Sequence, residues 1–89
     1  MNPSDLTGRD LDLAVTEALG IDTPWPMGWC EPRKIPELFA EIAARNGGGT
    51  VGMVRLPSGG FTASCFSGLA TGATPNEALA RLLLMVAQR

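Results

Sequence analysis

The chain has 89 residues, of which 45% are hydrophobic and 18% charged, so it is apolar enough to fold and too short for two cores. Its net charge of −2 argues against binding to DNA or RNA duplexes, and the absence of histidine excludes a histidine general base and most transition-metal sites. We therefore expect one globular domain over residues 1–89, with no enzymatic activity and no cofactor.

The N-terminus shows no basic and apolar leader, and no apolar run approaches the roughly 20 residues of a membrane span. A cytoplasmic protein that does not enter membranes is expected. Cys30 and Cys65 lack the spacing of a zinc site, and both are predicted to be free thiols. Cys65 belongs to a buried strand face, whereas Cys30 precedes Arg33 and Lys34, two cations that would lower its pKa.

Two helices are predicted in the first half of the chain. Thr7 and Asp10 have the spacing of a capping box, and the helical pattern that follows ends at Gly20, whose backbone suits a helix end. A second helix is expected around Pro36, which favours a first turn, and it ends at the glycine run 46–49. Each helix is expected to bury one apolar face in a common core.

The second half of the chain predicts a β-hairpin and a last helix. Residues 57–60 form the turn of the hairpin, whose exposed edge invites either a second protomer or a short third strand near residues 69–71. The last helix begins at Thr74, three residues before Glu77, and its apolar stripe is wider than one small core requires. The predicted class is α+β in the order ααββα, layered as an α/β/α sandwich, with a sheet that can extend across an oligomer.

This order of elements resembles the phage ABA sandwich domain family. The similarity covers nearly the whole chain, and it is carried by Trp29-Cys30 and by the Thr-Pro-x-x-Ala-Leu helix start within residues 70–79. The resemblance implies a small phage-encoded protein, with helix layers around a sheet, that acts in the host cytoplasm. It implies no particular activity, because a fold alone does not define one.

The loop over residues 21–33 is rich in proline and carries the best candidate ligand site. Trp25 and Trp29 precede Arg33 and Lys34, so an aromatic ring could stack on a purine while the cations bind its phosphates. In the alternative interpretation the tryptophans fill the core. The predicted ligand-binding set is completed by Arg55 on a strand and by Thr71 and Thr74 before the last helix, whose free amides favour an anion.

Two functions fit these features. The first is antagonism of host antiviral defence by sequestering a small anionic signal, such as a cyclic nucleotide or an ADP-ribose derivative, in a pocket at the interface of a homo-oligomer. This role needs aromatic rings and arginines but no catalytic histidine, and the mean hydropathy of +0.12 favours self-association into a dimer or larger assembly. The second is a protein–protein interaction module that inhibits a host protein or scaffolds a phage assembly.

Overall fold

The computed structural model describes residues 6–22, 27–45, 50–66 and 68–87. It confirms the α+β class, with three helices and a small antiparallel sheet whose third strand is supplied by the chain itself. The elements are, in chain order, α1 (Gly8–Ala18), the 3-10 helix η2 (Pro32–Lys34), α2 (Ile35–Arg45), β1 (Val51–Arg55), β2 (Phe61–Cys65), β3 (Gly68–Gly72) and α3 (Pro75–Ala87).

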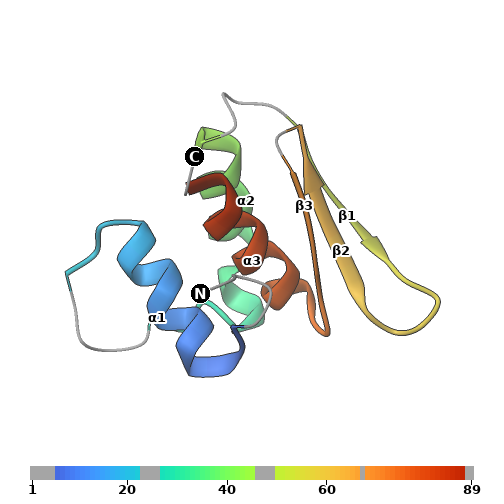
Figure 1. The fold of residues 1–89 in the computed structure, drawn as a ribbon, viewed down its shortest axis with the longest axis horizontal. Helices are drawn as coiled ribbons and strands as arrows, with labels where there is room; N and C mark the ends of the chain where they lie inside the picture. Colours follow the sequence, from blue (N-terminus) through green and yellow to red (C-terminus); the bar gives the residue numbers. More distant parts are fainter. Residues whose placement is uncertain (1–5, 23–26, 46–49, 67, 88–89) are drawn as a thin grey trace.

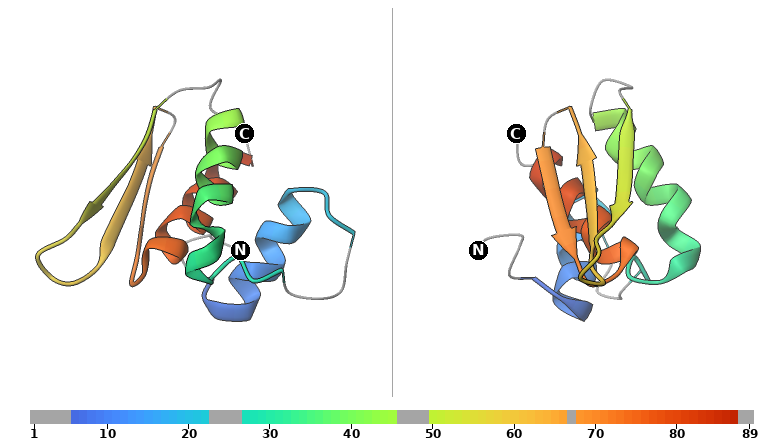
Figure 2. Two further views of the ribbon diagram at one scale, coloured as in Figure 1. Left: turned by 180° about the vertical axis from the view of Figure 1, so that it is seen from behind. Right: turned by 90° about the vertical axis from the view of Figure 1, so that its right-hand side faces the viewer.

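All three helices lie on one side of the sheet (Figure 1). Helices α2 and α3 cover one face of the sheet, and α1 packs against α3 on the side that faces away from the strands (Figure 2). The layers therefore run from α1 through α2 and α3 to the sheet. Among the described residues, no helix covers the outer face of the sheet.

Strand β2 is the centre of the sheet and pairs antiparallel with both β1 and β3. The predicted hairpin is confirmed. Two hydrogen bonds close its turn: the Gly59 N–H donates to the Leu56 carbonyl at 3.0 Å, and the Leu56 N–H donates to the Gly60 carbonyl at 2.7 Å. Gly59 has φ +100°, a conformation that glycine adopts without strain. Side chains alternate between the two faces, so that Met53, Ala63 and Ala70 share the face toward the helices while Val54, Thr62 and Thr71 share the outer face.

Helix α3 lies at the centre of the core. It contacts the sheet, α2 and α1, so it needs an apolar surface around most of its circumference. Its fully buried side chains include Leu79, Leu82 and Leu83, and Leu84 on the α1 side is almost fully buried as well. The width of the apolar stripe is therefore explained within one chain and is no sign of a partner.

The predicted start of the first helix at Thr7, its end near Gly20 and the start of the last helix at Thr74 agree with the structure, but the predicted hydrogen bonding at Thr7 does not. Thr74 caps α3 by accepting the Glu77 N–H at 3.1 Å, and Gly20 after α1 has φ +75°. The predicted capping box at Thr7 is wrong, because the Thr7 side chain makes no cap hydrogen bond. Gly8, the first helical residue, has φ +53°, which is incompatible with the regular first turn that a capping box requires. The predicted glycine stop over residues 46–49 lies outside the described residues.

Candidate functional site

Trp29 lies in the core. Only 3% of its surface is exposed, its indole N–H donates to the Thr16 hydroxyl at 3.1 Å, and Lys34 Nζ lies 5.0 Å from the ring centroid. Lys34 Nζ also pairs with Glu37 Oε1 at 3.2 Å. A ring so enclosed has no free face on which a nucleobase could stack. The core interpretation of Trp29 therefore fits the structure, and Trp25 lies outside the described residues.

A buried carboxylate of α1 organises the loop that carries Trp29. Asp12 is 5% exposed and accepts the backbone N–H groups of Met27 and Gly28 at 2.9 Å and of Trp29 at 3.1 Å. These charge-assisted bonds satisfy three backbone donors that have no other hydrogen-bond partner among the described residues. Sequence reasoning missed this role of Asp12. A signal was available, because Asp12 and Thr16 are four residues apart and so lie on one side of the helix.

A second buried side chain holds the same loop from α3. Asn76 Nδ2 donates to the backbone carbonyl of Trp29 at 3.0 Å and to that of Glu31 at 2.5 Å. Its partners lie 47 and 45 residues earlier in the chain, so no local pattern of the sequence points to them. The part of the loop over residues 27–31 is therefore held between α1 and α3 by these two side chains.

The structure does not bring the predicted ligand-binding residues together. Arg33 is exposed and forms an ion pair with Glu31, next to the Trp29 loop. Arg55 is the last residue of β1, and Thr71 lies on the outer face of β3. Trp29, Arg33 and Lys34 lie together at the loop before α2, whereas Thr71 and Thr74 lie at the junction of β3 and α3. Among the described residues of the predicted set, Arg33 alone lines one of the three hollows described below.

The N-terminus of α3 already holds a carboxylate. Glu77 Oε1 accepts the Ala73 N–H at 3.4 Å and pairs with Arg81 Nη2 at 2.8 Å, while the Thr74 hydroxyl accepts the Glu77 N–H. The end of the helix dipole is thus stabilised by a side chain of the same helix. Thr74 serves as a helix cap, and an anionic ligand at this helix end would have to compete with Glu77.

The expected lowering of the Cys30 pKa by nearby cations is wrong. Burial raises the pKa of the Cys30 thiol above its ordinary value of 9.0, and the negative charges of Asp12 and Glu77 raise it further. Neither cysteine forms a disulfide, and Cys65 packs against the core from β2, as expected. A thiol with a raised pKa is a poor nucleophile at neutral pH.

A hollow of about 410 Å³ lies beside the Trp29 loop, and its lining includes Arg9 at the start of α1 and Arg33 of η2. The charges around it are mixed, because Glu31 and Asp12 line it together with the two arginines. Asp12 is engaged by backbone amides and Glu31 by Arg33. The remaining lining residues are Gly8, Met27, Gly28 and Cys30.

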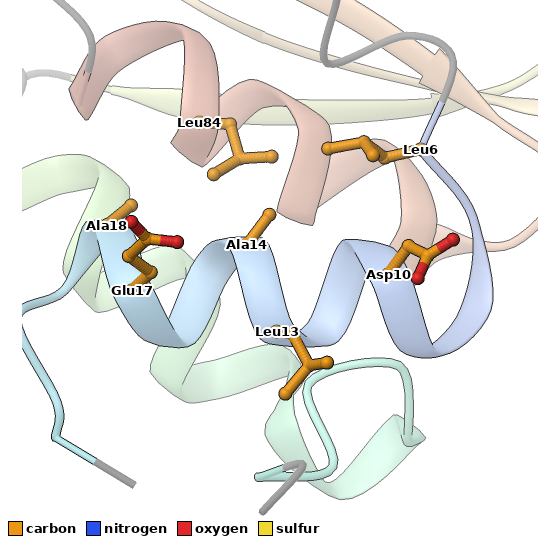
Figure 3. A pocket seen from close by; sticks show the side chains of 7 residues that line it. All are labelled: Leu6, Asp10, Leu13, Ala14, Glu17, Ala18 and Leu84. Carbon is orange, nitrogen blue, oxygen red and sulfur yellow. The ribbon is translucent and has the colours of Figure 1, made fainter. Parts of the chain in front are cut away.

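A larger groove of about 660 Å³ runs between α1 and α3. Figure 3 shows that Ala14, Leu84 and Leu6 point toward one another across it, while Asp10 and Glu17 mark its two ends on α1. Leu13 and Ala18 complete the lining. The groove therefore combines an apolar floor with a carboxylate at each end.

The groove wall at Leu6 is held by α3. The Arg81 guanidinium donates to the Leu6 carbonyl at 3.2 and 3.0 Å and to the Thr71 carbonyl at 2.8 Å, and it also pairs with Glu77. One side chain thus joins the N-terminal segment, the last strand and the last helix. Sequence reasoning did not single out Arg81, because its partners are 10 and 75 residues away.

Within the described residues, the carboxylates of this side differ from those elsewhere. Four glutamates on the other elements are paired with a lysine or arginine: Glu31, Glu37, Glu41 and Glu77. Asp10 and Glu17 form no ion pair in the described part of the chain, nor does Asp22, which lines an adjoining hollow together with Glu17. Helix α1 carries one cation, Arg9, which forms no ion pair in the described chain, and three carboxylates, so the α1 side of the molecule presents net negative charge.

Comparison with protein families, with curated proteins and with solved structures finds no match to this chain. The resemblance to the phage ABA sandwich family stays a prediction. In residues 6–22, 27–45, 50–66 and 68–87, no three His, Cys, Asp or Glu side chains gather as metal ligands would. None of the helices in the described ranges is long and apolar enough to cross a membrane.

Proposed function

We propose that this protein is a non-enzymatic interaction module that binds a basic amphipathic helix of a partner protein in the groove between α1 and α3. One observation carries the proposal: an apolar floor formed by Leu6, Ala14 and Leu84 ends on either side at a carboxylate that has no ion-pair partner in the described chain. An apolar helix face fits such a floor, and its flanking cations fit the carboxylates.

The spacing of the two carboxylates defines the partner further. Asp10 and Glu17 are seven residues apart on one face of α1, a separation of about 10 Å along the helix axis. Two arginines or lysines seven residues apart on a helix that lies along α1 match that separation. The same carboxylates repel an anionic ligand, so this groove does not suit a nucleotide. Under the resemblance to a phage family, the partner would be a host protein in the host cytoplasm or a component of a phage assembly.

The proposal is tested with a designed helical peptide of about four turns that carries leucines on one face and arginines seven residues apart. We expect saturable binding by calorimetry, weakened at least tenfold in an Asp10→Asn/Glu17→Gln double variant and weakened by salt. Glu37→Gln is the matched control, because it removes the same kind of charge from α2, outside the groove. Equal affinity for a peptide with glutamates in place of the arginines contradicts the proposal.

A second candidate function is the sequestration of a small anionic ligand, in the hollow beside the Trp29 loop. What favours it is that two arginines, Arg9 and Arg33, line this hollow next to the first turn of α1. What weighs against it is the ion pair between Arg33 and Glu31, which an anion would have to displace. In this function the ligand contacts the arginines, and Trp29 only supports the loop.

The second candidate is tested by thermal shift with linear and cyclic nucleotides and with ADP-ribose. A ligand that binds the folded chain raises the melting temperature, and Arg9→Ala with Arg33→Ala abolishes the rise. Lack of any shift across these compounds argues against the anionic-ligand function and leaves the groove proposal intact.

A further inference from the structure

The outer face of the sheet exposes large apolar side chains. Val54 on β1 is 61% exposed, Leu69 on β3 is 57% exposed, and Phe66 at the turn between β2 and β3 is 97% exposed. Val54 and Leu69 point away from the helices, because their neighbours Met53 and Ala70 pack on the helix side. In the described chain four large hydrophobic residues are exposed, and these are three of them; the fourth is Ile21.

This face is also almost free of charge. Residues 50–76, which include all three strands and their turns, contain one charged residue, Arg55. Natural sheets normally protect exposed strands with lysines or other charges. In this chain one carbonyl of the β3 edge, that of Thr71, is occupied by a hydrogen bond from Arg81. In the described strands, the outer face of the sheet carries no such charged side chain. A neutral face attracts no charged partner and brings no repulsion between two copies of a chain whose net charge is −2.

The pattern of side-chain size on the face is self-complementary. The register places Gly52, Ser64 and Leu69 in one row across the strands, and Val54, Thr62 and Thr71 in the next row. The ends of the two rows form four corners. The larger residues Leu69 and Val54 occupy one diagonal pair of corners, and the smaller residues Gly52 and Thr71 occupy the other pair. A twofold axis in the plane of the face, either along or across the strands, sets each large side chain opposite Gly52 or Thr71 of the other copy.

We propose that two copies of this chain associate face to face through the outer surface of the sheet, as an aligned packing of two sheets. The strands, three in number and five residues long, give a face of about 14 by 17 Å. This is a small interface, so the dimer is weak and forms at micromolar or higher concentration. The inference is independent of the groove, which lies on α1, beyond α2 and α3.

Sedimentation equilibrium tests the dimer on the whole chain, from about 10 µM to about 1 mM. We expect the average mass to rise from that of a monomer toward that of a dimer. Leu69→Lys weakens this association at least tenfold, because it buries a charge opposite a neutral surface. Ile21→Lys is the matched control: it converts another exposed apolar residue, after α1, and leaves the association unchanged.

Val54→Lys, on the opposite edge strand, repeats the test at the other corner of the face, so the result does not depend on the folding of one variant. Circular dichroism confirms that each variant keeps its helices. A wild-type chain that stays monomeric over the whole range overturns the inference. So does a dimer that both lysine variants form with the affinity of the wild type.

Discussion

The side-chain amide of Asn76 donates a hydrogen bond to the backbone carbonyl of Trp29 at 3.0 Å, and so ties the first turn of α3 to a loop 47 residues earlier. Asp12 of α1 accepts the backbone N–H of the same tryptophan at 3.1 Å. The loop is therefore held by a donor on one helix and an acceptor on another. This arrangement keeps the Trp29 ring in the core, where its indole N–H meets Thr16.

Asn76→Asp is expected to destabilise the fold by about 1–3 kcal/mol. The change is nearly isosteric, but it replaces a donor that serves two carbonyls with a carboxylate that repels them. A negative charge in the first turn of a helix would stabilise an exposed position, so the expected sign is opposite to the helix-dipole effect. Urea unfolding measures the difference. A variant as stable as the wild type contradicts the assigned role of the amide.

Asp12→Ala should cost about 3 kcal/mol of unfolding free energy, because three backbone N–H groups lose their acceptor. Asp10→Ala is the matched control on the same helix. It is exposed and is expected to cost less than about 1 kcal/mol. Chemical denaturation of both variants gives the comparison. Similar losses in the two would show that Asp12 does not organise the loop.

Gly72→Ala tests the close approach of α3 to β3. A Cβ at position 72 would lie 2.6 Å from the backbone nitrogen of Ala78 and 2.9 Å from the Glu77 Cβ, so helix and strand must separate. We expect a loss of about 1–3 kcal/mol in thermal or urea unfolding. At Gly52 the same Cβ meets only the Ser64 Oγ, at 3.7 Å, so Gly52→Ala is expected to be neutral or slightly stabilising.

The raised pKa of Cys30 predicts slow alkylation. At about pH 8, iodoacetamide should modify Cys30 more slowly in the folded chain than in denaturant, because the thiolate is the reactive form. Tryptic peptides ending at Arg33 and Arg81 separate Cys30 from Cys65, so mass spectrometry follows each thiol. Faster modification in the folded state would show that the neighbouring cations lower the pKa of Cys30 by more than burial and the nearby carboxylates raise it.

The raised pKa of Cys30 also makes the folding stability depend on pH. Above the ordinary thiol pKa of 9.0 the unfolded chain loses the Cys30 proton while the folded chain retains it, so folding stability contributed by this group falls as the pH rises through that range. Below that range the contribution is unaffected by pH. Cys30→Ala should make the stability less dependent on pH there, as measured by urea unfolding at several pH values.

Features governed by neighbouring residues were predictable from the sequence. The Pro-Ser-Gly-Gly turn at residues 57–60 determines the hairpin locally, and Thr74 begins α3 because its hydroxyl reaches the N–H three residues on. The exception at Thr7 has a local cause as well, the positive φ of Gly8. Sequence composition alone does not reveal that backbone angle.

Features governed by distant residues were not predictable. A core position of Trp29 is one of two interpretations that the sequence allows, but the residues that hold it there, Thr16, Asp12 and Asn76, come from two helices and leave no local pattern. The groove depends on Leu6, which Arg81 holds from 75 residues away, and on the stacking of α1 against α3. Hydrophobic periodicity shows that α1 and α3 have apolar faces, but it does not show which of them meet.

Mapping the peptide contact by 15N–1H NMR distinguishes the α1–α3 groove from the other surfaces of the molecule. On titration with the arginine-bearing amphipathic peptide, we expect the amide resonances of Ala14, Ala18 and Leu84 to shift and those of Val54 and Leu69 on the sheet to stay in place. The Asp10→Asn/Glu17→Gln variant should show the same resonances almost unmoved. Shifts confined to Gly28 and Arg33, or no shift at saturating peptide, would contradict the assignment of the α1–α3 groove as the binding site.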